Sequence, residues 1–119
     1  MRRDMDLVRK ILVATADARQ PLEASVFADE RHDYQEVAYH FRIMEQAGLV
    51  AASLVPGDNG YYYAAVESLT WEGQDFLSAV ANDGVWRKVS MKIAKIAGDA
   101  TLDVTKALAV KELGNLLMQ

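Results

Sequence analysis

The chain of 119 residues is 51% hydrophobic and 25% charged, with a formal net charge of −4 and no cysteine. This composition predicts one globular domain and excludes a disordered chain, and the lack of cysteine excludes disulfides and thiolate metal sites. No apolar run approaches the roughly 18 residues that span a membrane, and the basic residues near the start precede a charged stretch. We therefore expect a soluble cytoplasmic protein with no signal peptide and no membrane partner.

Charge is distributed unevenly along the chain. Residues 1–20 carry five basic side chains against three acidic ones, residues 21–68 carry two against eight, and residues 69–119 carry six against six. The middle of the chain is therefore strongly acidic. Such a region opposes contact with nucleic acid, because cationic side chains that neutralise phosphates supply most of the non-specific affinity.

The first predicted element is a helix from about residue 4 or 6 to about residue 18. Its apolar residues recur at helical spacing behind acidic residues that suit a helix N-terminus: Leu7, Val8, Ile11, Leu12 and Ala14. Pro21 ends this helix, and residues 22–27 predict an edge strand. Residues 28–33 are polar and leave room for one helical turn at most. We therefore expect the second helix of a helix-turn-helix unit to be short or missing.

Residues 34–47 predict a second long helix with one apolar stripe. The stripe lies at i, i+4 and i+7: Val37, Phe41 and Met44. Gly48 ends the helix, and we expect it to adopt a positive φ. Residues 49–66 predict a β-hairpin, because two extended segments flank a turn rich in Pro, Gly, Asp and Asn. The order of helix, glycine and hairpin is that of the second half of a winged helix-turn-helix domain.

Further helices are expected after the hairpin. Thr70 is the expected N-cap of the first, in which Trp71 faces the core, and Trp86 anchors the next. The last predicted helix, at 102–118, is apolar over more than half of its circumference. Because a domain of this size rarely buries two helix faces, we expect the spare face to form a homodimer. The expected contact residues are Leu113, Leu116 and Leu117.

The predicted fold class is mainly α with a small antiparallel β-sheet, as in a winged helix-turn-helix with additional C-terminal helices. Residues 1–70 would form the winged-helix core, with the recognition-like helix at about 34–47 and the wing hairpin at about 49–66. Residues 71–119 would pack on this core within the same single domain.

Six blocks of sequence resemble one protein family. They are MRRDMDLVRKIL at 1–12, YHF at 39–41, MEQAGLV at 44–50, LTWEGQDFL at 69–77, VWRKV at 85–89 and LDVTKALAV at 102–110. The chain resembles the bacterial and prophage domain of unknown function 2513, which implies a winged-helix-like fold and no established activity. Residues 39–50 are similar, more loosely, to MarR, ArsR and PadR repressors, in which this helix enters the major groove. The wing of this chain departs from theirs because it has no Lys or Arg.

Two functions follow from these patterns. The first is a DNA-binding transcriptional regulator that contacts double-stranded DNA through the helix at 34–47 and a lysine stripe. Its candidate contacts are Gln35, Tyr39, His40, Arg42, Lys88 and Lys92. The alternative is a protein-protein interaction module without DNA binding, which would meet its partner through the acidic face at 29–36 and the tyrosines at 61–63. Because no nucleophile, phosphate-loop or metal-ligand motif is present, we expect no enzymatic activity, no cofactor and no metal.

Overall fold

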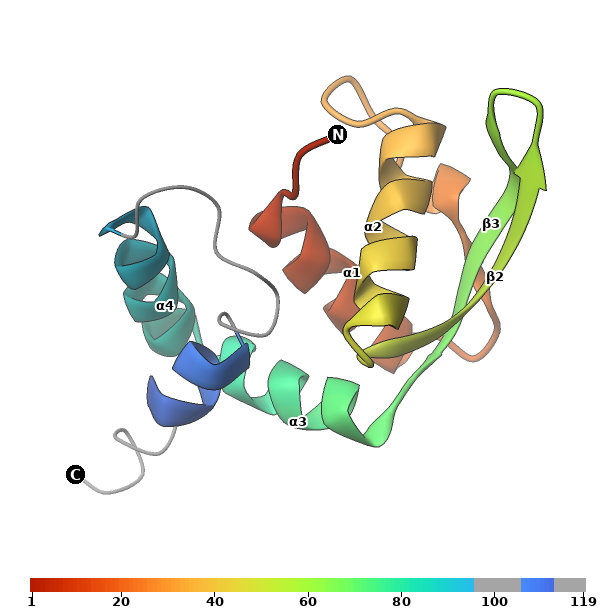
Figure 1. The fold of residues 1–119 in the computed structure, drawn as a ribbon. Helices are drawn as coiled ribbons and strands as arrows, with labels where there is room; N and C mark the ends of the chain where they lie inside the picture. Colours follow the sequence, from red (N-terminus) through yellow and green to blue (C-terminus); the bar gives the residue numbers. More distant parts are fainter. Residues whose placement is uncertain (96–105, 113–119) are drawn as a thin grey trace. The chain divides into compact units, whose positions relative to one another are not determined.

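The computed structural model describes residues 1–95 and 106–112. The chain forms two compact units, Met1–Gln74 and Asp75–Gln119. The described part is mainly helical with one small antiparallel sheet of three strands (Figure 1), which confirms the predicted fold class. The winged-helix description is compatible with this arrangement. The packing of residues 71–119 on a core formed by residues 1–70 stays a prediction.

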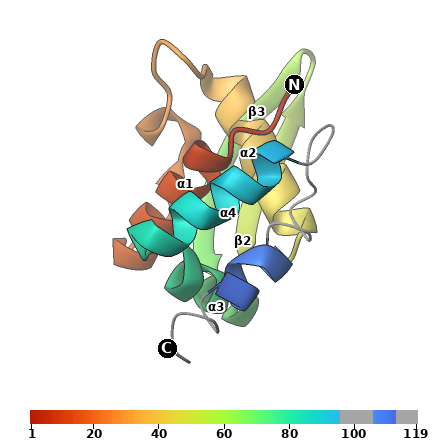
Figure 2. The same cartoon turned by 90° about the vertical axis from the view of Figure 1, so that its left-hand side faces the viewer.

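The first unit contains the whole sheet. Its elements are α1 (Met5–Asp17), β1 (Leu22–Glu23), the 3₁₀ helix η1 (Ala24–Val26), α2 (Tyr34–Gln46), β2 (Val50–Gly57), β3 (Gly60–Leu69) and the start of α3 (Trp71–Val80). The strands lie in the order β1-β3-β2, and both pairs are antiparallel. Viewed from the side of the helices, β2 and β3 lie behind α1 and α2 (Figure 2).

The edge strand predicted at 22–27 is shorter than expected. It pairs with β3 only at Leu22 and Glu23, and the chain then turns into η1, where the N–H of Phe27 donates to the Ala24 carbonyl at 3.1 Å. A strand would point these two side chains to opposite faces, whereas a 3₁₀ turn aligns residues i and i+3. Ala24 and Phe27 are both buried, so the turn is favoured by packing. This turn occupies the place of the missing second helix.

The core of the first unit lies between α1, α2 and the sheet. Its largest fully buried side chains include Ile11 and Leu12 of α1, and Phe41 and Met44 of α2. The ring of Phe27 meets that of Phe41 edge to face, with centroids 5.9 Å apart. The predicted apolar stripes of both helices therefore face inward. Asp4 caps α1, because its side-chain oxygen accepts hydrogen bonds from the N–H groups of residues 6 and 7. Of the two predicted starts of this helix, residue 4 or residue 6, the structure therefore favours the first.

The C-terminal end of α2 confirms the role predicted for Gly48, whose φ is +77°. The Leu49 N–H donates to the Met44 carbonyl and the Gly48 N–H donates to the Glu45 carbonyl, both at 2.9 Å. This pair of bonds is a Schellman motif, which needs a left-handed residue after the last helical turn. The hairpin that follows has Asp58 and Asn59 as its two-residue loop, between Gly57 and Gly60.

Thr70 caps α3, because the Gly73 N–H donates to its hydroxyl oxygen at 3.0 Å. Gly73 packs directly on the preceding chain: a Cβ placed there would lie 1.9 Å from the carbonyl oxygen of Leu49. The prediction that Trp71 faces the core is wrong, since its side chain is 85% exposed. At 100° per residue, Trp71 lies about 140° and about 180° around the helix from the buried residues Phe76 and Val80.

The second unit contains α4 (Asp83–Lys95) and a helical segment at 106–112. Asn82 caps α4 by accepting the Val85 N–H at 3.0 Å, and Trp86 is buried as predicted. The rest of the helix predicted at 102–118 lies outside the described residues. So do the predicted dimer contacts Leu113, Leu116 and Leu117, and the homodimer stays a prediction. Within the described ranges, none of the helices is both long enough and apolar enough to span a membrane.

Candidate functional site

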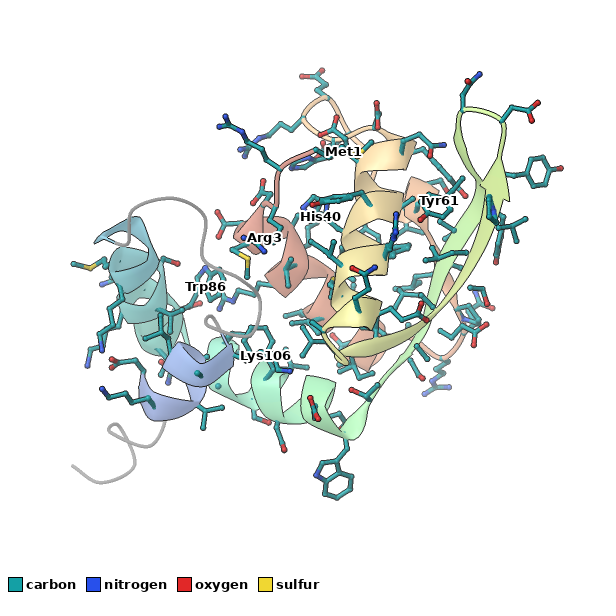
Figure 3. The ribbon with its side chains drawn as sticks, viewed as in Figure 1. Met1, Arg3, His40, Tyr61, Trp86 and Lys106 are labelled. Carbon is teal, nitrogen blue, oxygen red and sulfur yellow. The ribbon has the colours of Figure 1, made fainter. Side chains whose placement is uncertain are left out.

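The candidate site is the outward face of α2 together with the wing, which is the β2–β3 hairpin. Gln35, a predicted base contact, instead joins these two elements. Its side-chain carbonyl accepts the Tyr61 N–H at 2.7 Å, and its amide donates to the Tyr61 carbonyl at 2.9 Å. Figure 3 shows Tyr61 where β3 runs beside α2. Both ends of the Gln35 amide are therefore engaged, and a base contact from it would have to break this pair.

Tyr34 makes a similar contact one residue earlier. Its hydroxyl accepts the Ala64 N–H at 3.0 Å and donates to the Glu23 carboxylate at 2.8 Å. Burial and the hydrogen bond to Glu23 raise the pKa of the Tyr34 phenol, so it remains a donor at neutral pH. Strand β1 pairs with β3 only at Ala65 and Val66. At Tyr61 and Ala64, side chains from the first turn of α2 form the hydrogen bonds to the β3 backbone. These bonds fix the wing against the helix.

The edge of β2 is protected too. A register shift between Ala51 and Ala52 disturbs the ladder, and the Ala52 N–H donates to the Glu45 carboxylate at 2.9 Å. Pro56, near the end of the same strand, has no N–H to offer. A side-chain cap, a register shift and a proline are all devices that keep an edge strand from pairing with another chain. These features weaken the β2 edge as a place where another strand could pair.

His40 is 1% exposed, which contradicts its assignment to a nucleic-acid surface. Its Nε2 accepts the Asp4 N–H at 2.9 Å and its Nδ1 donates to the Glu36 carbonyl at 2.7 Å. Burial lowers the pKa of His40, so the ring is neutral at pH 7 with its proton on Nδ1. Figure 3 shows His40 between α1 and α2, where it connects the two helices.

His32 forms a polar cluster with carboxylates of both helices, which sequence reasoning missed. Its Nε2 lies 2.9 Å from the Asp4 carboxylate, and its Nδ1 lies 3.4 Å from the Glu36 carboxylate. The hydrogen bond to Asp4 raises the pKa of His32, although burial opposes the shift. A spacing of four residues between His32 and Glu36 was the available signal, whereas Asp4 is distant in sequence. Among residues 1–95 and 106–112, no group of three or more His, Cys, Asp or Glu is placed to hold a metal ion.

The acidic face predicted at 29–36 is largely committed to local structure. Asp29 accepts the N–H groups of Arg31 and His32, both at 2.9 Å, and Asp33 caps α2 by accepting the Glu36 N–H at 2.8 Å. Together with the pairing of Glu36 and His32, these bonds use three of the four carboxylates in the segment. A protein contact through this face stays a prediction with fewer available groups than the sequence suggested.

The remaining predicted nucleic-acid contacts are Tyr39, Arg42, Lys88 and Lys92. Tyr39 is half-buried, with its ring edge-on to His40 at 5.5 Å, and Arg42 is exposed. Lys88 is exposed on α4, and Lys92 forms an ion pair with Glu112. The two lysines belong to the second unit, whereas Tyr39 and Arg42 belong to the first. On α2 the structure therefore leaves one exposed cation among the predicted contacts.

The wing combines exposed aromatic side chains with negative charge. Tyr62 is 84% exposed, Val55 46% and Tyr63 37%. Residues 43–86 contain six acidic residues and no Lys or Arg. Two of the acidic residues, Asp58 and Glu67, are on the wing. An open hollow of about 240 Å³ at the wing tip is lined by Gln35 and residues 57–62. The arrangement can bind apolar or cationic groups, and it repels anions.

The sequence of this chain matches that of a known protein family. Residues 2–100 match the family described as "Hypothetical protein (DUF2513)". A relative from Haemophilus influenzae, named "Uncharacterized protein", is 32% identical over 120 residues, which cover 98% of this chain and 99% of the relative. No solved structure matches the chain. The resemblance to the domain of unknown function 2513 is confirmed over residues 2–100, and the sequence block at 102–110 lies beyond that match. The looser similarity to MarR, ArsR and PadR repressors stays a prediction.

Proposed function

The chain belongs to the family described as "Hypothetical protein (DUF2513)", and we propose that it acts as a protein-protein interaction module on a winged-helix scaffold, without DNA binding. The observation that carries this proposal is the wing, which exposes Tyr62, Tyr63 and Val55 on a hairpin that has no cationic side chain. Tyrosine is enriched among the residues that dominate binding energy in protein interfaces.

The charges of α2 and the wing favour this function over DNA binding. A DNA-binding protein typically neutralises about 6–10 phosphates with Lys and Arg. Between residues 34 and 69 the chain offers Arg42 as its one cation, against four carboxylates: Glu36, Glu45, Asp58 and Glu67. A winged helix whose reading helix and wing are both acidic would be repelled by the duplex it must enter.

The rigidity of the wing also supports a role in docking. Gln35 and Tyr34 hold β3 from one side, and Glu45 holds β2 from the other. A surface that is ordered before binding loses less conformational entropy when the partner arrives. Gln35, which was predicted to read bases, therefore supports a preformed protein-binding surface together with Tyr34 and Glu45.

Site-specific photo-crosslinking tests this function in cells that express the protein. A benzophenone amino acid replaces Tyr62 in one variant, Arg42 in a second and the exposed Glu30 in a control. We expect discrete protein adducts from position 62, and none of the same mass from position 30. Nucleic-acid adducts from position 42, or an absence of adducts from position 62, would overturn the proposal.

DNA binding is the second candidate, and one observation favours it. The order α1, β1, a short turn, α2 and the hairpin puts α2 in the place of a recognition helix, with Arg42 exposed on it. Fluorescence anisotropy with labelled genomic duplexes at about 50 mM salt tests this candidate. If the protein binds DNA through α2, binding should be saturable, and Arg42→Ala should weaken it. The control Gln46→Ala, which changes another exposed residue of the same helix, should leave the affinity unchanged.

A further inference from the structure

We propose that the partner presents a cationic segment, rich in Arg or Lys, to the wing surface formed by Val55, Asp58, Tyr62, Tyr63 and Glu67. This inference rests on the proposed function and specifies the chemistry of the partner. The surface lies within a stretch of 44 residues, 43–86, in which every charged side chain is acidic. A cationic partner would therefore meet no like charge along β2, β3 or α3.

The wing tip offers a specific place for a cationic side chain. The hollow of about 240 Å³ is lined by the exposed residues Asp58 and Tyr62 and by the other residues of the turn. A guanidinium or ammonium group there would pair with the carboxylate and lie against the tyrosine ring, which attracts cations through its electron-rich face. Gln35 also lines the hollow, but its amide is bonded to Tyr61, which fixes the wall on that side.

Val55 and Tyr63 provide an apolar contact elsewhere on the hairpin, outside the residues that line the hollow. They are directly opposite each other in the β2–β3 ladder, so their side chains share one face of the hairpin. Glu67 follows Tyr63 on the same strand and is exposed, with its carboxylate accepting a hydrogen bond from the Ser53 hydroxyl. Apolar contact flanked by carboxylates is the complement of a segment in which basic and apolar residues are interspersed.

Other occupants of the wing surface fit less well. A second copy would bring an identical set of carboxylates, so that pairing of two wings is repulsive. A peptide added as an extra strand would find the Ala52 N–H already bonded to Glu45 and no N–H at Pro56, so two positions along the β2 edge cannot donate to it. A partner that binds through side chains does not depend on these two positions, and it does not have to be extended.

Fluorescence anisotropy with synthetic peptides tests the inference on the full chain. The probe is a fluorescein-labelled peptide in which arginine alternates with alanine and leucine, and the comparison peptide has glutamine in place of every arginine. We expect the arginine peptide to bind saturably at about 50 mM salt and to weaken steeply as salt increases, and the glutamine peptide not to bind. Thermal unfolding of each variant confirms that it is folded.

Three variants locate the contact. Tyr62→Ala should weaken the arginine peptide about threefold to fivefold, because it removes a contact between a cation and an exposed aromatic ring. Glu67→Lys should weaken it about fivefold or more, since attraction becomes repulsion. The control Glu30→Lys makes the same change in net charge at an exposed residue away from the wing, and it should change the affinity less than about twofold.

The outcomes separate this inference from the proposed function. Equal losses in Glu67→Lys and Glu30→Lys would show diffuse attraction to an acidic protein and would overturn the inference. It is also overturned if the glutamine peptide binds as well as the arginine peptide. If position 62 still crosslinks to a protein in cells under either result, the interaction module stands and its partner is not cationic. If position 62 crosslinks to nothing, the proposed function itself fails.

Discussion

Gln35→Ala removes the side chain that joins α2 to the wing. The substitution breaks two hydrogen bonds, at 2.7 and 2.9 Å, and leaves the half-buried N–H and carbonyl of Tyr61 without their present partner. Each such bond contributes about 0.5–1.5 kcal/mol net, and alanine returns a few tenths through its helix propensity. We therefore expect the free energy of unfolding to fall by about 1–2 kcal/mol.

Two measurements check this prediction. The melting temperature should fall by about 4–8 °C per kcal/mol for a unit of this size, and the Tyr61 amide should exchange with solvent faster than in the parent protein. Gln46→Ala is the matched control, because Gln46 is an exposed glutamine on the same helix, and it should change the stability by less than about 0.5 kcal/mol. Equal stabilities of the two variants, with unchanged exchange at Tyr61, would refute the reasoning.

Three further predictions follow from the fold. Gly73→Ala places a Cβ 1.9 Å from a backbone carbonyl and should cost about 1–3 kcal/mol in urea unfolding. Gly84→Ala should cost less, because a Cβ there would lie 3.1 Å from the side-chain oxygen of Asn82 and not against backbone; equal effects would contradict the packing. Gly48→Val should cost about 1 kcal/mol or more at a φ of +77°, and an unchanged melting temperature would count against this backbone assignment. The hydrogen bond to Asp4 raises the pKa of His32, so the stability from its protonated ring is complete below about pH 6.5 and is lost as the pH rises through the raised pKa. His32→Gln should therefore lower the unfolding free energy more at about pH 5.5 than at about pH 8.5; a loss that does not vary with pH would exclude this role.

The elements that local sequence determines were predicted well. The helix at 34–47, the positive φ of Gly48 and the hairpin all depend on features within a few residues: helical periodicity, one glycine and a polar turn. The 3₁₀ turn at 24–26 depends on packing against α2 and the sheet, which no local pattern reveals. The exposure of Trp71 agrees with helical geometry, because the large buried residues of α3, Phe76 and Val80, lie on the opposite side of the helix.

The candidate site was harder to predict, because a helical wheel identifies the outward face but not what folds over it. Gln35 is outward on α2, yet the hairpin passes close enough to bond both ends of its amide. His40 is on the flank of the same helix, and α1 covers it through a contact 36 residues away in sequence. In contrast, the absence of cations from the wing is a property of the sequence itself.

A pair of NMR titrations tests the central claim, that the wing binds a cationic protein segment and α2 does not bind DNA. Two-dimensional ¹H–¹⁵N NMR spectra of the labelled chain are recorded at about 50 mM salt, first with duplex DNA and then, in a separate sample, with the arginine peptide. The account predicts that the peptide shifts the amide signals of residues 57–67 saturably and that DNA leaves the signals of residues 34–46 unchanged. Saturable shifts of residues 34–46 with DNA, with no response of the wing to the peptide, would contradict it.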